Sequence, residues 1–162
     1  MNAQTPPTLH LMVGLPGSGK TTLARRLERE LSALRFTPDE WIAGLYGQDL
    51  TQATLDAARD PVEGLQWRVA SRALSLGLSV ILDFGFWTRS ERDRFRAQAV
   101  ELRALCQVHA LVVPEPELWA RLERRNAALP PATFRISREQ LGTWWSLFEP
   151  PDVTELSNST YG

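Results

Sequence analysis

The chain has 162 residues, of which 43% are hydrophobic and 23% charged, and its formal net charge is −1 at pH 7. This length favours one domain with a sizeable core, and the small net charge excludes a general attraction for long nucleic acid. One cysteine excludes an internal disulfide framework, and no apolar run reaches the roughly 20 residues of a membrane span. With no signal-peptide pattern either, we expect one cytoplasmic domain over residues 1–162 that contacts no membrane.

The first third of the chain predicts two strands and two helices. The apolar stretch Thr8–Val13 favours a buried strand, and leucines at helical spacing predict a helix from Ser18 to about Ala33. A short second strand ends at Arg35–Thr37. The sequence TPDE (Thr37–Glu40) is typical of a capping box, with proline at the first helical position, so a second helix begins there.

The rest of the chain continues to alternate between helices and strands. Expected in chain order are a helix over 60–76, a strand over 78–86, a helix over 88–105, a doubly buried strand over 106–113, a helix carrying 117–127, a loop over 129–136, a helix over 137–148 and a polar tail over 149–162. Such alternation predicts an α/β fold with a parallel sheet between helix layers. Ligands of such sheets bind beyond the carboxyl ends of the strands.

The stretch GLPGSGKT (Gly14–Thr21) fits the pattern G-x-x-x-x-G-K-[ST] and lies between an expected strand and an expected helix. Its glycines let backbone N–H groups converge on a phosphate, and the helix N-terminus adds a positive dipole. Lys20 is the only lysine among 18 basic residues, which indicates a position where a planar guanidinium does not fit. The candidate phosphate-binding residues are Gly14, Leu15, Pro16, Gly17, Ser18, Gly19, Lys20, Thr21 and Thr22.

Two carboxylates follow expected strands. Asp39 could accept the proton of an attacking hydroxyl, or it could simply complement a helix N-terminus, with Glu40 as a second candidate base. Asp83 ends the strand VILD and could hold Mg²⁺ together with the Thr21 hydroxyl, or it could begin the turn before Gly85.

Arginines and aromatic residues supply the remaining candidates. Arg121 and Arg125 share one helix face and could close a lid (about 121–136) over a nucleotide, or lie on a solvated face with Glu117 beside Arg121. Asn126 is a candidate neighbour of the adenine ring of a bound nucleotide. Aromatic residues expected to rim a cleft or to pack a core are Trp41, Phe84, Phe86 and Trp87, whereas those expected mainly to pack are Trp144, Trp145 and Phe148. Arg89 and Arg92 are candidates for contact with an anionic substrate or for solvated charges.

The segments GLPGSGKTT, TPDEW, VILDFGFWTRSERD and RLERRNA resemble, in this order, small P-loop kinases of the zeta-toxin and polynucleotide-kinase-like branch. The resemblance implies a three-layer P-loop NTPase fold with four to five parallel strands, ATP with Mg²⁺, and phosphoryl transfer to a hydroxyl. It also implies roles for individual residues. These are Lys20 and Thr21 as the Walker A pair, Asp39 as the base, Asp83 as the acid that ends the third strand, and Arg121 with Arg125 as the lid pair.

One departure bears on the acceptor. Polynucleotide kinases of this branch tend to place an arginine three residues after the base, where this chain has Ile42. We therefore expect a kinase for a small-molecule acceptor, with a nucleoside triphosphate as the other partner and nucleic acid unlikely. The alternatives are a nucleotide-binding switch or ATPase without an acceptor, and a 5′-hydroxyl polynucleotide kinase.

Overall fold

The computed structural model describes residues 5–157, and its centre is a parallel sheet. The described residues form four strands, which are β1 (Thr8–Val13), β2 (Leu34–Phe36), β3 (Val80–Gly85) and β4 (Leu105–Ala110). Their order across the sheet is β2-β3-β1-β4, and all three pairings are parallel. The prediction of an α/β fold with a parallel sheet is confirmed.

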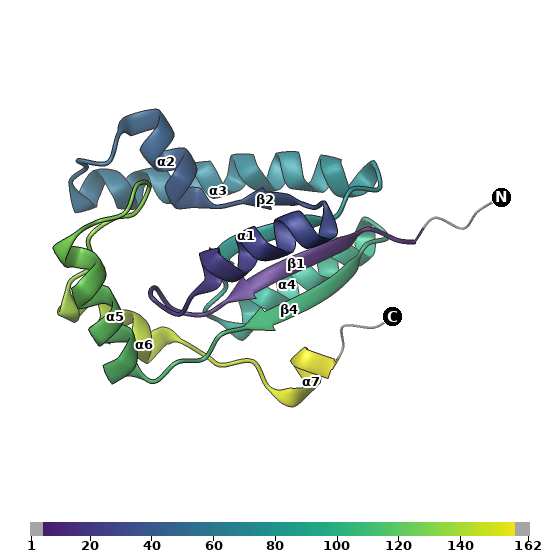
Figure 1. Ribbon diagram of the computed structural model, residues 1–162. Coiled ribbons are helices and arrows are strands. Elements are labelled where there is room, and N and C mark those ends of the chain that lie inside the picture. Colours follow the sequence, from purple (N-terminus) through teal and green to yellow (C-terminus); the bar gives the residue numbers. More distant parts are fainter. Residues whose placement is uncertain (1–4, 158–162) are drawn as a thin grey trace.

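Seven helices surround the sheet within residues 5–157. They are α1 (Lys20–Leu31), α2 (Pro38–Tyr46), α3 (Gln52–Ser75), α4 (Arg89–Glu101), α5 (Glu115–Ala127), α6 (Arg138–Leu147) and α7 (Val153–Ser157). In Figure 1, α1 lies in front of the sheet and α4 behind it, while β1 and β4 point towards α5 and α6. None of the helices in this part of the chain has both the length and the apolarity that crossing a membrane requires.

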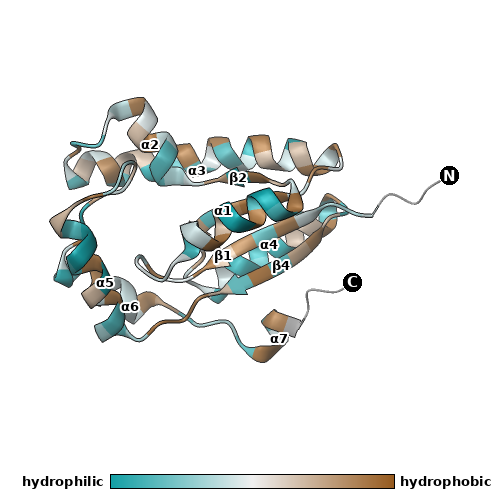
Figure 2. Ribbon diagram, viewed as in Figure 1, coloured by the Kyte–Doolittle hydropathy of each residue, from teal (hydrophilic) through white to brown (hydrophobic). Residues whose placement is uncertain are grey.

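The alternation of side chains along β1 divides the core into two layers. Leu9, Leu11 and Val13 pack with residues of α3 and α4, whereas Met12 packs with Ala24 of α1. Fully burying one aliphatic side chain stabilises the fold by about 1.5–3 kcal/mol, so both layers contribute. Figure 2 shows the result, with β1 largely hydrophobic and the front of α1 mostly hydrophilic.

Strand β4 differs from its prediction. It lies at the edge of the sheet, and of its six residues only Val108 is buried, so the expectation of burial on both faces is wrong. No fifth strand is present among residues 5–157, and the tail forms the short helix α7, which contacts β4. An apolar run alone does not distinguish a central strand from an edge strand that a helix partly covers.

The predicted capping box at Thr37 is also wrong. Helix α2 begins at Pro38 as expected, but Thr37 caps no backbone N–H with its side chain. The Thr37 hydroxyl instead donates to Asp83, and Glu40 pairs with Arg25 and Arg35 at 2.8 and 3.0 Å. The side chains of Thr37 and Glu40 therefore bond to residues distant in sequence rather than to each other's backbone. A reciprocal capping box is present at the start of α6, between Ser137 and Gln140.

Helix α3 begins earlier than predicted, at Gln52 rather than at Asp60, and it continues through Pro61. Thr51 caps it by accepting from the Thr54 N–H at 3.2 Å. A proline inside a helix removes one backbone hydrogen bond and crowds the preceding turn. The apolar contacts that Leu55, Ala58 and Val62 make with Ile42 of α2 outweigh this cost.

The C-terminal segment is anchored rather than free. Arg92 of α4 is fully buried and donates to Glu155 of α7 at 2.7 and 2.9 Å. The expected contact of Arg92 with an anionic substrate is therefore wrong, as is the alternative of a solvated charge. Arg89 remains exposed and pairs with Asp152.

Because Pro61 costs α3 a hydrogen bond, we expect Pro61→Ala to raise the free energy of unfolding by about 1–3 kcal/mol. Urea denaturation measures the change. Pro116→Ala is the matched control, since Pro116 lies in the first turn of α5, where a proline costs little. No gain from Pro61→Ala, or an equal gain from the control, would contradict the prediction.

Candidate functional site

One cleft lies at the carboxyl edge of the sheet and has a volume of about 580 Å³. Its walls come from the glycine loop (residues 14–21), the end of β3, the starts of α2 and α4, the first half of α3, α5, α6 and the segment 130–136. This is the edge at which parallel sheets bind ligands. Of the predicted site residues, those that line the cleft are Pro16, Gly17, Gly19, Lys20, Thr21, Thr22, Asp39, Asp83, Arg121 and Arg125. Gly14, Leu15 and Ser18 lie beneath its surface.

The glycine loop packs tightly against α5. Gly17 has φ +84°, and a Cβ there would lie 3.2 Å from a carbon of Leu122. Leu15 anchors the loop from below, buried with Leu118 and Leu122. Only glycine combines this backbone conformation with so close an approach.

The first turn of α1 faces the cleft as an anion site. Among residues 5–157, no side chain caps this turn, and the turn itself contains no acidic residue. Its N–H groups and the helix dipole therefore remain available to a negative group. The Ser18 hydroxyl is buried and has no hydrogen-bond partner in the described chain.

Lys20 stands at the bottom of the same loop. Its Nζ donates to the carbonyl oxygen of Leu15 at 3.0 Å. Burial lowers the pKa of the Lys20 ammonium, and the charges of Asp83 and Asp39 oppose this shift. An incoming phosphate would likewise favour the charged form of Lys20.

Asp83 meets Thr21 because of the alternation along β3. Ile81 packs against α1, so Asp83, two residues later, faces α1 as well. The Asp83 Oδ2 accepts hydrogen bonds from Thr21 at 2.6 Å and from Thr37 at 3.1 Å. Burial raises the pKa of the Asp83 carboxyl, although Lys20 and the two hydroxyls act against it.

The Asp83 side chain fits a divalent cation. Its Oδ1 is buried without a partner in the described chain, and a buried unpaired carboxylate oxygen is costly. The Thr21 hydroxyl and a carboxylate are oxygen donors of the kind that Mg²⁺ takes beside nucleotide phosphates. Since no group of three or more His, Cys, Asp or Glu side chains in residues 5–157 could hold a metal, phosphate oxygens and water must complete such a site.

Asp39 faces the cleft at the start of α2 and has a partner that the sequence did not suggest. Arg59 of α3 donates from Nη2 to the Asp39 Oδ1 at 2.7 Å. Glu40, the other candidate base, is committed elsewhere. Its burial tends to raise its pKa, but hydrogen bonds from Arg25 and Arg35 outweigh this and hold the pKa below its usual value.

Arg121 and Arg125, the predicted lid pair, line the cleft from α5. Arg121 donates to the carbonyl oxygens of Gly17 and Ser18 at 3.2 and 3.4 Å, and it also pairs with Glu117. Arg125 donates to the carbonyl oxygen of Phe134 at 3.1 Å, while its Nε is buried without a partner in the described chain. Both guanidiniums therefore lie where a phosphate on the glycine loop would be close.

Hydrogen bonds hold the segment 130–136 across the cleft. The Asn126 side chain exchanges two of them with the backbone of Ile136, at 2.7 and 3.2 Å. Gln48, between α2 and α3, donates to the carbonyl oxygens of Pro130 and Thr133. The amide of Asn126 is thus committed to the segment, and Asn126 does not line the cleft. Its place beside a nucleotide base stays a prediction.

The aromatic residues that line the cleft are not quite the expected ones. Phe84, Phe86 and Trp87 line the cleft, whereas Trp41 does not and instead packs against Phe36 of β2. Trp144 of α6, expected to pack only, also lines the cleft and lies 5.4 Å from Trp87 between ring centroids.

Sequence reasoning missed six charged residues that line the cleft, namely Arg25, Asp56, Arg59, Glu63, Glu91 and Arg135. Arg59 and Glu63 are one turn apart on α3, and this spacing alone is typical of a surface ion pair. Burial raises the pKa of Glu63 from 4.5 to about 7, with Arg59 opposing the shift and Glu91 adding to it. Glu63 therefore titrates near neutrality.

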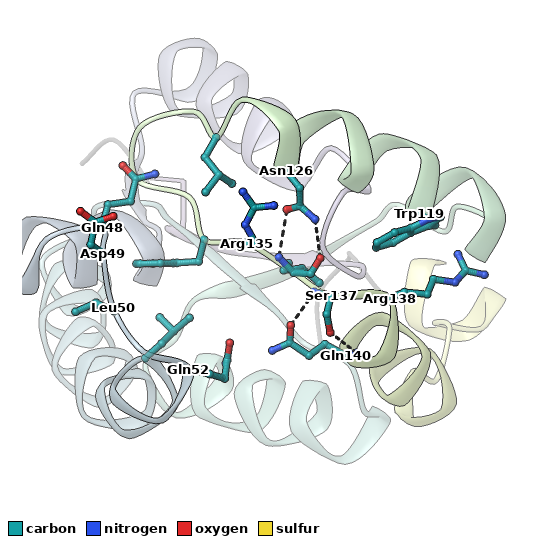
Figure 3. Close-up of a pocket in the computed structure, with 14 residues that line it drawn as sticks. Gln48, Asp49, Leu50, Gln52, Trp119, Asn126, Arg135, Ser137, Arg138 and Gln140 are labelled. Atoms are coloured by element: carbon teal, nitrogen blue, oxygen red, sulfur yellow. Dashed lines mark hydrogen bonds between the residues drawn. The ribbon is translucent and has the colours of Figure 1, made fainter.

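A second cavity, of about 660 Å³, shares the segment 134–136 with the cleft but contains no residue of the glycine loop (Figure 3). Figure 3 shows Asn126 pointing to this segment and Ser137 bonded to Gln140, so these polar groups already have partners. The cleft with the glycine loop is therefore the candidate functional site.

The pKa of Glu63 also predicts a pH dependence of stability. Folded Glu63 keeps its proton up to about pH 7 while the unfolded chain releases it near 4.5, so unfolding becomes easier as pH rises through this range. We expect Glu63→Gln to raise the free energy of unfolding by about 1–2 kcal/mol above pH 7, with solvent screening taken into account. Below pH 4.5 the gain should disappear. Urea denaturation, once above pH 7 and once below pH 4.5, measures the change in the free energy of unfolding. Glu123→Gln, on the exposed face of α5, is the control.

Comparison with known proteins agrees with the fold. Three solved structures have similar folds. A candidate kinase from Chloroflexus aurantiacus is 19% identical with a TM-score of 0.74, the match covering 92% of this chain and 80% of that one. Kti12 of Chaetomium thermophilum, in complex with ADP-AlF3, is 22% identical with a TM-score of 0.68. This match covers 90% of this chain and 82% of that one. A chain of the Pnkp1/Rnl/Hen1 RNA repair complex is 23% identical with a TM-score of 0.70.

The match to the RNA repair chain covers 90% of this chain but only 45% of that one. These identities show a shared fold, and comparison with curated proteins found no match. The family profile described as AAA domain matches residues 9–151, which include the glycine loop, Asp39, Asp83 and the lid arginines. The chain is a member of this AAA domain family.

Proposed function

We propose that the protein is an ATP-dependent kinase that transfers the γ-phosphoryl group to a hydroxyl of a small-molecule acceptor. The observation that carries the proposal is the layout of one cleft. Lys20 and the Thr21–Asp83 pair line it from α1 and β3, and Asp39 lines the same cleft from α2. A site that only held a nucleotide would not require this additional carboxylate.

The glycine loop is the proposed binding site of the triphosphate. The free N–H groups of the first α1 turn would bind phosphate oxygens, and Lys20 would exchange its bond to Leu15 for the β- and γ-phosphates. Arg121 and Arg125 would neutralise charge that develops on the transferred group. The fold neighbour Kti12, solved with ADP-AlF3, supports nucleotide binding by this fold.

Thr21 and Asp83 are the proposed protein ligands of Mg²⁺. When bound there, the cation would offset charge on the phosphates and orient them. Its positive charge would also lower the pKa of Asp83, which burial raises.

Asp39 is the proposed general base. The acceptor hydroxyl gives its proton to the Asp39 carboxylate as its oxygen forms a bond to the γ-phosphorus, and the bond from that phosphorus to the bridging oxygen breaks to release ADP. Arg59, bonded to Oδ1 of Asp39, fixes the orientation of the carboxylate and leaves Oδ2 for the substrate.

The position three residues after Asp39 bears on the type of acceptor. Ile42 is fully buried against α3 and does not line the cleft. The acceptor half of the cleft contains Phe84, Trp87 and Trp144, which suit the apolar face of a ring. Both features favour a compact acceptor over a polynucleotide.

A pooled-metabolite phosphorylation screen with γ-labelled ATP and magnesium tests the function, with Lys20→Ala as the blank. We expect labelled product from the natural sequence and none from the variant. Excess ATP should also raise the melting temperature of the natural sequence alone, since a ligand at about 100 times its Kd stabilises by about 2.7 kcal/mol. A pool containing 5′-hydroxyl oligonucleotides is included, and label in that pool alone would contradict a small-molecule acceptor. An absence of any ATP-induced shift would overturn the proposal.

Asp39→Asn should lower the rate of phosphoryl transfer by about 10²–10⁴-fold, because an amide cannot accept the proton. The affinity for ATP, measured by calorimetry, should stay nearly the same. Asp60→Asn, an exposed carboxylate of α3 outside the cleft, is the control and should change neither quantity. Equal losses of transfer and ATP affinity would argue against Asp39 as the base.

A further inference from the structure

The C-terminal segment 149–157 packs against the turn that joins β3 to α4. The backbone N–H of Glu149 donates to the carbonyl oxygen of Trp87 at 2.9 Å. In return, the Glu149 carboxylate accepts from the backbone N–H of Arg89 at 2.6 Å. The turn and the segment are thus joined by hydrogen bonds in both directions.

A buried ion pair adds a second connection from inside. Nη1 of Arg92 donates to the carbonyl oxygens of Phe86 and Trp87, at 3.1 and 3.4 Å. Its Nε and Nη2 donate to Glu155, whose side chain is only 2% exposed. Burying a guanidinium without a carboxylate partner is costly, so Glu155 stabilises the Arg92 side chain in this position.

The turn itself has an unfavourable backbone. Phe86 has φ 44° and Gly85 has φ 105°. A Cβ on Gly85 would lie 2.9 Å from Nε1 of Trp87, so the indole lies directly against the backbone. A non-glycine residue at positive φ persists only where surrounding contacts hold it. Here the packing of Phe86 against Phe84 and Phe95 holds its side chain, while Arg92 and the C-terminal segment hold the backbone carbonyl oxygens of the turn.

The side chain that this turn presents belongs to the cleft. Trp87 lines it together with Trp144, and their ring planes are 41° apart. Displacement of the Trp87 backbone would therefore change the shape of the wall that Trp87 and Trp144 form.

We propose that the segment 149–157 is a positioning strap that, through the Arg92–Glu155 pair, holds Trp87 in the acceptor wall of the cleft. The role of that wall rests on the proposed kinase function. Arg92 and Glu155 are positioning residues, since neither lines the cleft.

Circular dichroism tests the positioning directly. Two indoles as close as Trp87 and Trp144 couple their electronic transitions and give a pair of bands of opposite sign. Trp87→Phe identifies this signal by removing it, and Trp145→Phe, an exposed indole outside the pair, should leave it unchanged. In Glu155→Gln the paired bands should fall towards the level of Trp87→Phe.

Arg89→Gln is the matched control for the strap. It removes an exposed ion pair to Asp152 in the same segment, and the paired bands should persist. Paired bands of unchanged strength in Glu155→Gln, or an equal loss in Arg89→Gln, would overturn the proposal. If Glu155→Gln does not fold, Glu155→Asp decides, because it keeps the charge but shortens its reach. It should weaken the bands, and full strength would overturn the proposal.

Two further measurements separate this proposal from the proposed function. In calorimetry, Glu155→Gln should bind ATP with the same affinity as the natural sequence. If neither protein binds ATP, the proposed kinase function is overturned, but the circular dichroism result still tests the position of Trp87. With the acceptor from the screen, the variant should raise the acceptor KM about tenfold, equivalent to about 1.4 kcal/mol, and leave the KM for ATP unchanged. A lower kcat with an unchanged acceptor KM would contradict the strap.

Discussion

The hydrogen bond from Thr21 to Asp83 is the contact on which the site depends. It joins the first turn of α1 to the end of β3, and the bond from Thr37 to the same oxygen adds the end of β2. Three segments separated in sequence thus meet at one buried carboxylate. The parallel sheet brings them together because the carboxyl ends of its strands share one edge. Without that edge, the glycine loop would be a turn with a lysine and no partner for a metal.

Several groups of the cleft cost folding free energy. Lys20 and Asp83 are charged groups whose burial opposes ionisation, and Glu63 is shifted further towards its neutral form. Ser18 and Arg125 contribute buried polar atoms without partners in the described chain. Native proteins tolerate such groups where a ligand supplies the missing interactions. Their concentration around one cleft is what separates this site from the cavity beyond the segment 134–136.

Sequence patterns predicted the strands, the glycine loop and the side chains that follow the strands, because each depends on local periodicity and on where parallel strands end. They did not predict partners that come from distant elements. Arg59 reaches Asp39 across the interface of α2 and α3, and Glu155 reaches Arg92 from a tail that looked polar and free. Nothing in the spacing of these residues distinguishes a buried pair from two solvated charges. The same limit explains β4, whose apolar run does not reveal an edge position.

Gln48 connects the two halves of the cleft through hydrogen bonds from one amide to the segment 130–133. It follows α2, the helix that begins with Asp39. Lifting that segment must therefore break two bonds, worth about 0.5–1.5 kcal/mol each, or move the loop behind the carboxylate as well. A constraint on one of these two segments is consequently a constraint on the other, because Gln48 bonds to both carbonyl oxygens. For the proposed kinase, a nucleotide that ordered one wall would reduce the entropy that the acceptor loses on binding to the other wall.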